Sequence, residues 1–80
     1  MEIKYPHAAA KAISGMDRPT KQRIKTAIEG LPQGDVKPLK GYAGYYRLRV
    51  GGWGIIFNYP NDETLLIAKI APRGDVYKGV

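Results

Sequence analysis

Two short breaks divide residues 45–71 into three segments typical of strands, and this pattern restricts the fold more than any other feature. Gly51-Gly52 suits a tight hairpin, and Pro60-Asn61-Asp62-Glu63 suits the next turn. Between these breaks, large apolar residues occupy every second position: Trp53, Ile55, Phe57 and Tyr59. The pattern predicts a three-strand antiparallel meander over about 45–50, 53–59 and 64–71.

The first part of the chain predicts one short strand and two helices. Ile3 and Tyr5 alternate with polar residues before Pro6, and residues 7–16 then carry apolar side chains at helical spacing. Asp17 is a suitable cap for a second helix that ends at Gly30. Its apolar stripe consists of Ile24, Ala27, Ile28 and Leu31. Residues 33–35 predict a turn and residues 36–41 a connector.

These elements predict a single α+β domain over residues 1–80. The order β-α-α-β-β-β separates helices from strands, which is typical of a two-layer fold in which both helices pack on one face of the meander sheet. Trp53 and Phe57 are then expected in the core. We favour packing over base stacking for Trp53, because the surrounding strand is apolar.

Composition excludes several classes of function. The chain has no cysteine and a single histidine, His7, so neither a disulfide framework nor a zinc site is expected, and no cofactor is predicted. No apolar run is long enough to span a bilayer, which predicts a protein of the cytoplasm without a membrane partner. Thirteen Lys and Arg against seven Asp and Glu give a net charge of +6, which favours a polyanionic partner.

Arg47 and Arg49 are two residues apart in a predicted strand and therefore share one face, opposite Leu48 and Val50. No acidic residue lies between Asp35 and Asp62, so no carboxylate within that span neutralises the pair. Two arginines fixed on one strand suit the binding of phosphate oxygens. The alternative interpretation is a solvated strand face that carries arginines for solubility.

Arg73 and Tyr77 follow the last predicted strand, and a meander can return this tail to the face that carries Arg47 and Arg49. Three guanidinium groups and a phenol suit RNA cleavage, because the ribose 2′-OH supplies the nucleophile. The protein then needs to orient the phosphate, stabilise charge and move protons. His7 lies far from this set in the sequence, and we assign it a structural or surface role.

The chain resembles the RelE/ParE toxin superfamily, and specifically its RelE-like branch. The resemblance extends over nearly the whole chain and rests on the order of several weak motifs: Ile24 to Leu31, Leu39-Lys40-Gly41, Tyr46 to Gly51, Trp53 to Phe57 and Arg73 to Tyr77. It implies a metal-independent toxin that cleaves messenger RNA in the ribosomal A site. It also implies a cognate, RelB-like antitoxin that wraps and inactivates the toxin.

The resemblance also implies a role for each candidate residue. Arg47 and Arg49 match the basic pair that holds the RNA backbone, Arg73 matches the residue that assists the leaving group, and Tyr77 matches the general base and stacking platform. Gly54 departs from the pattern, because an arginine that stabilises the scissile phosphate usually stands there. This departure predicts either a weakened natural toxin or a deliberately disarmed variant.

Two other functions stay open. A ParE-like protein would inhibit DNA gyrase without cleaving RNA, although such relatives generally lack the cluster of cleavage residues. A non-catalytic module would use the same cationic surface to bind RNA or an acidic protein, with an affinity that falls steeply as salt rises.

Overall fold

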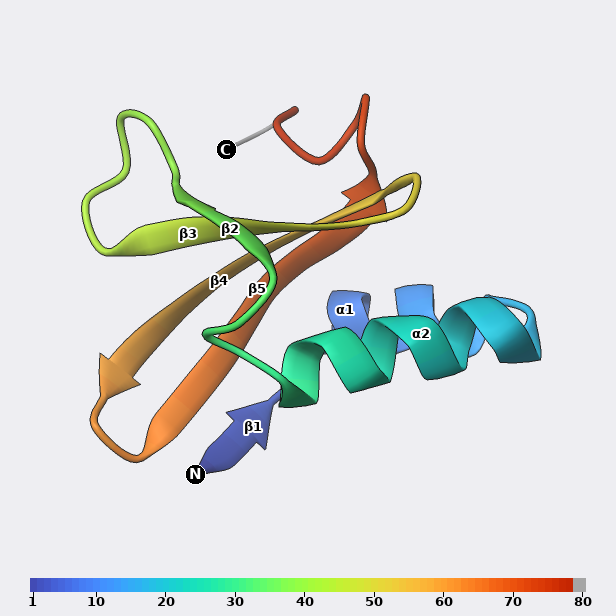
Figure 1. Ribbon diagram of the computed structural model, residues 1–80, viewed down its shortest axis with the longest axis horizontal. Helices are drawn as coiled ribbons and strands as arrows, with labels where there is room; N and C mark the ends of the chain where they lie inside the picture. Colours follow the sequence, from blue (N-terminus) through green and yellow to red (C-terminus); the bar gives the residue numbers. More distant parts are fainter. Residues whose placement is uncertain (79–80) are drawn as a thin grey trace.

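The computed structural model describes residues 1–78 and shows two layers, a five-stranded sheet and two helices that pack on one of its faces (Figure 1). The elements in chain order are β1 (Glu2–Lys4), α1 (His7–Ser14), α2 (Arg18–Glu29), β2 (Asp35–Pro38), β3 (Tyr45–Val50), β4 (Trp53–Asn61) and β5 (Thr64–Pro72). The predicted α+β fold and the predicted meander, β3 to β5, are confirmed.

The sheet has the order β1-β5-β4-β3-β2, with β1 parallel to β5 and the other pairs antiparallel. The strand β2 corrects the sequence-based prediction of a turn at 33–35 and a connector at 36–41. It pairs along β3, with Val36 opposite Leu48. Pro38 is tolerated because β2 lies at the edge of the sheet, where one side of the backbone needs no partner.

A β-bulge in β5 determines which of its side chains face the helices. Phe57 pairs with Ile67 but Ile56 pairs with Lys69, so Ala68 is the extra residue. Ile67 therefore contributes to the helix-side core together with Ile70, three positions later. The shift also places Lys69 opposite Ile56, on the face away from the helices.

The helix-side core explains why α2 forms where the sequence predicts it. The side chain of Asp17 accepts a hydrogen bond of 3.4 Å from the backbone N–H of Thr20, and hydrogen bonding from Thr20 lowers the pKa of the Asp17 carboxyl. Gly30 caps the other end. Ile24 and Ile28 are buried against the sheet, and Trp53 packs at the edge of the same cluster. Among residues 1–78, no helix is long and apolar enough to cross a membrane.

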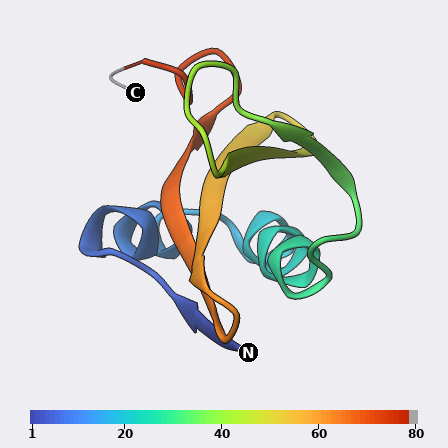
Figure 2. The same cartoon turned by 90° about the vertical axis from the view of Figure 1, so that its left-hand side faces the viewer.

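A second, smaller cluster covers the opposite face of the sheet and consists of Leu39, Ile56 and Val76. The loop at 39–44 and the segment at 73–78 both lie on the side away from the helices (Figures 1 and 2). Hereafter, the C-terminal segment means residues 73–78. This arrangement positions the candidate site, because the tail and the 39–44 loop flank the face that carries Arg47 and Arg49.

We expect Ile24→Ala to lower the free energy of unfolding by about 2–5 kcal/mol, since the side chain is fully buried and its removal leaves a cavity. Lys25→Ala, at the next and exposed position of α2, is the matched control and should change stability little. Urea denaturation followed by circular dichroism measures both. Equal effects of the two substitutions would contradict the assigned orientation of α2.

Candidate functional site

Basic side chains gather on the face of the sheet opposite the helices. Residues directly opposite one another in the ladder share a face, so two rows can be read from the strand register. One row contains Lys37, Arg47, Ile56 and Lys69, and the next contains Asp35, Arg49, Gly54 and Ala71. We call Lys37, Arg47, Arg49 and Lys69 the cationic face. Asp35 is the one acidic residue in these two rows, so the surface has a positive local charge.

Arg47 is buried beneath this surface, with only 5% of its area exposed. One side-chain nitrogen, Nη1, lies 3.7 Å from the carboxylate of Asp35, and it has no hydrogen-bond partner among residues 1–78. The sequence places Asp35 just outside the acid-free span, and β2 folds it back against β3. The arginine pair is therefore partly neutralised by a strand that the sequence analysis did not predict.

Arg49 differs from Arg47 in its environment. Its side chain is exposed, and it lies opposite Gly54 on the neighbouring strand. Of the two arginines, Arg49 is accessible to solvent in this conformation, whereas Arg47 lies below the surface. The two arginines lie on the same face of the sheet, as predicted, but Arg49 is exposed and Arg47 is buried.

The C-terminal segment folds onto the same face of the sheet. The backbone N–H of Arg73 donates to the carbonyl of Gly52 in the β3–β4 hairpin, at 2.9 Å. Val76 is fully buried against Ile56, and its backbone N–H donates to the carbonyl of Pro72, at 2.9 Å. Arg73 and Tyr77 flank this anchor and are exposed, Tyr77 by 43%. The structure thus brings the tail to the face that carries Arg47 and Arg49.

Gly54 contacts the C-terminal segment directly. A Cβ atom at this position would lie 2.7 Å from Cγ1 of Val76, a distance that real Cβ atoms essentially never show, and 3.0 Å from Cβ of Val76. The present arrangement therefore has no room for a side chain at position 54, and a larger residue requires the segment to move. The sequence marks Gly54 as unusual within a strand but gives no indication that Val76 lies against it.

Lys69 is a member of the cationic face that the sequence analysis missed. Its ammonium group donates a hydrogen bond to the backbone carbonyl of Lys78, while the Lys78 ammonium lies 3.1 Å from the carboxylate of Asp75. Lys69 thereby joins β5 to the end of the C-terminal segment. Its available signal was a single cation in an otherwise apolar strand, 64–71.

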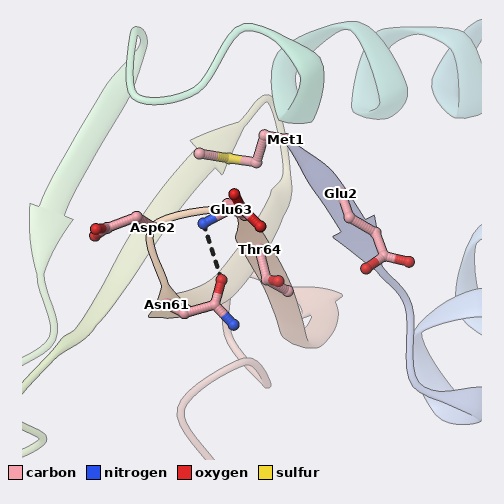
Figure 3. A pocket seen from close by; sticks show the side chains of 6 residues that line it. All are labelled: Met1, Glu2, Asn61, Asp62, Glu63 and Thr64. Atoms are coloured by element: carbon pink, nitrogen blue, oxygen red, sulfur yellow. Dashed lines mark hydrogen bonds between the residues drawn. The ribbon is translucent and has the colours of Figure 1, made fainter.

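The surface hollow near the N-terminus has a different character. It measures about 500 Å³ and is lined by Met1, Glu2, Asn61, Asp62, Glu63 and Thr64 (Figure 3). The side chain of Asn61 accepts a hydrogen bond from the backbone of Glu63, at 2.8 Å. The carboxylates that line this hollow repel a polyanion. Across the described part of the chain, no group of acidic or histidine residues is arranged to hold a metal ion. His7 begins α1 in the helix layer, apart from the cationic face.

The fold is similar to that of small toxins of the RelE type. The RelE chain of a RelB–RelE antitoxin–toxin complex from Methanococcus jannaschii matches 89% of this chain and 91% of its own, with a TM-score of 0.72 and 27% identity. The RelE–RelB complex from Pyrococcus horikoshii OT3 matches 91% and 94%, with a TM-score of 0.70 and 26% identity. The RelBE2 complex from Mycobacterium tuberculosis shares the fold, with a TM-score of 0.66 and 20% identity.

A relative in sequence agrees with the structural matches. Toxin RelE3 of Methanocaldococcus jannaschii is 27% identical to this chain over an alignment of 85 positions, gaps included. The alignment covers 96% of this chain and 96% of the relative. No protein-family model matches the sequence. Together the sequence relative and the structures support a RelE-like toxin of a toxin–antitoxin system, so the resemblance noted in the sequence is confirmed.

We expect Arg47→Met to leave stability unchanged or to raise it. The buried guanidinium loses hydration and gains one carboxylate neighbour at 3.7 Å, whereas methionine fills similar space without a charge. Chemical denaturation should place the variant at or above the midpoint of the parent. A loss of more than about 2 kcal/mol would show that the guanidinium stabilises the fold.

Proposed function

We propose that this protein is the toxin of a toxin–antitoxin pair and cleaves messenger RNA on the ribosome. The observation that carries the proposal is the seating of the C-terminal segment, with Arg73 and Tyr77, on the sheet face that bears Arg47 and Arg49. The similarity to RelE proteins supports the same assignment. The alternative of RNA cleavage by a metal-bound group receives no support from the donor residues of this face, which are basic apart from the single carboxylate of Asp35.

In the proposed reaction the ribose 2′-OH attacks the adjacent phosphorus, the new P–O2′ bond forms and the P–O5′ bond breaks. Arg49 is exposed and would contact the phosphate oxygens, where charge develops. Tyr77 would accept the 2′-OH proton as the general base. Arg73 would stabilise the departing 5′ oxygen, which takes up a proton from solvent water on release.

Arg47 has a separate role in this scheme. Its guanidinium is buried and incompletely hydrogen-bonded within residues 1–78, so its charge is weakly screened by solvent and acts on groups bound above it. A buried charge of this kind costs stability, and such costs are typical of functional sites. The proposal therefore assigns Arg47 to electrostatic stabilisation from beneath the phosphate.

The proposed protein partner is a RelB-like antitoxin. The structural relatives from two archaea were solved as RelB–RelE complexes, and the net charge of +6 favours an acidic segment as a partner. Such a segment would lie over the cationic face and compete with RNA for Arg49. The ribosome and its messenger RNA are the proposed targets when the antitoxin is absent.

A second candidate function, a non-catalytic RNA-binding module, is favoured by one observation. Val76 occupies the space beside Gly54, so no side chain at position 54 contributes a cation to the scissile phosphate. Losing one such group typically costs a hundredfold or more in rate, to order of magnitude. The same surface would still bind RNA through the cationic face.

The test compares the parent protein with Arg49→Ala and Tyr77→Phe in a purified translation system. We expect the parent to cut transcripts within codons at the ribosome, and each substitution to slow cleavage roughly a hundredfold. Arg18→Ala removes an exposed arginine at the start of α2, on the helix layer, and is the matched control. Primer extension on the transcript measures the rate and site of cleavage.

The contrary outcomes are distinct. RNA binding that weakens steeply with salt, without cleavage by the parent, would establish the non-catalytic module instead. Inhibition of supercoiling by purified gyrase, with transcripts intact, would establish a ParE-like function. If Arg18→Ala and Arg49→Ala slowed cleavage equally, the result would contradict a specific role of the cationic face in the reaction.

A further inference from the structure

Val76 is the buried residue of an otherwise exposed segment. Its neighbours from Arg73 to Asp75 and from Tyr77 to Lys78 are all exposed, whereas 1% of Val76 is accessible. Its side chain packs in the small cluster with Leu39 and Ile56, on the face away from the helices. Val76 is therefore the buried apolar side chain by which residues 73–78 pack against the sheet.

Gly54 provides the space that Val76 occupies. The three atoms that a Cβ at position 54 would meet first are Cγ1, Cβ and Cγ2 of Val76, at 2.7, 3.0 and 3.2 Å. Valine is stiff about χ1, so its methyl groups cannot rotate away freely. Among residues 1–78 the positive φ angles occur at other glycines, so the backbone at Gly54 does not require glycine. The requirement is for space.

The contact also sets the position of the segment relative to Arg49. Arg49 and Gly54 are directly opposite in the β3–β4 ladder, so a side chain that packs against Gly54 lies over the row that contains Arg49. The hydrogen bonds from Asp75 and Val76 to the carbonyl of Pro72, at 2.8 and 2.9 Å, form a turn that leads into this seat. Tyr77 follows immediately.

We propose that Val76 is a positioning residue and that Gly54 is its socket. Seating Val76 on Gly54 fixes Tyr77 and Arg73 relative to Arg49, an inference that rests on the proposed RNA cleavage for its functional consequence. Glycine at position 54 then provides the space for Val76, and its presence does not mean that a functional arginine was lost. Introducing arginine at position 54 alone should displace the C-terminal segment and lower activity.

The first experiment measures the seating of the segment without reference to activity. Gly54→Ala adds one Cβ against Val76, while Gly52→Ala adds one where no atom lies within 4 Å and is the matched control. Trypsin cleavage after Arg73 reports release of the segment. We expect Gly54→Ala to speed this cleavage roughly tenfold or more and Gly52→Ala to leave it unchanged. Equal rates in both variants would overturn the proposal.

A double-substitution cycle identifies Val76 as the group that position 54 contacts. In a Val76→Gly background the three nearest atoms are gone, so Gly54→Ala should cause no further increase in tryptic cleavage. An undiminished effect of Gly54→Ala in that background would overturn the assignment of the socket. Val76→Gly alone should already release the segment.

The functional arm uses Val76→Ala, which should lower the maximal rate of transcript cleavage roughly tenfold while leaving the ribosome concentration for half-maximal cleavage unchanged. Gly54→Arg should cleave more slowly than the parent, and Gly54→Arg with Val76→Gly should recover part of the loss. Faster cleavage by Gly54→Arg alone would overturn the proposal. If the parent cleaves nothing, the proposed function fails, and the trypsin comparison still decides whether Gly54 seats Val76.

Discussion

The fold depends on burial of the central strand β4 on both of its faces. Ile55 and Phe57 pack toward the helices, while Ile56 packs into the smaller cluster on the opposite face. A two-layer α+β protein commonly leaves one sheet face to solvent, and here a loop and the C-terminal segment cover part of it. The same short cover that completes the burial of Ile56 also holds Arg73 and Tyr77 next to the cationic face. Core packing and site assembly therefore share one small set of contacts.

The sequence predicted the helices and the meander because their signals are local. Apolar spacing, the Asp17 cap and the Gly51-Gly52 hairpin each lie within a few residues, and the structure agrees with all three. The edge strand β2 was missed because its single inward apolar residue, Val36, gives no alternation to read. Because β2 was not predicted, its residue Asp35 was not identified as the carboxylate neighbour of Arg47.

The role of Gly54 could not be predicted from neighbouring residues either, because it depends on a contact with a residue far away in the sequence. Its contact with Val76 joins positions 22 residues apart, counted from the numbering, and depends on the path of the C-terminal segment. The sequence showed that a side chain was absent from the strand face. It did not show that another side chain filled the space. The register shift at Ala68 was equally invisible, and it is this bulge that brings Lys69 onto the cationic face.

Acidic and basic side chains lie near opposite ends of the long strands. Glu2, Asp62 and Glu63 line the hollow at the β4–β5 turn, whereas Arg49 and Arg73 lie near the β3–β4 hairpin, at the other end of the long strands (Figures 1 and 3). This arrangement of charge would attract a polyanion to the hairpin end more than to the turn and so favour one orientation of approach. This orientation acts over about one Debye length, roughly 8 Å at physiological salt, and is strongest where solvent screens least. Under the proposed function, an acidic antitoxin and an RNA strand would both be attracted by the positive charge of the cationic face and would compete for it.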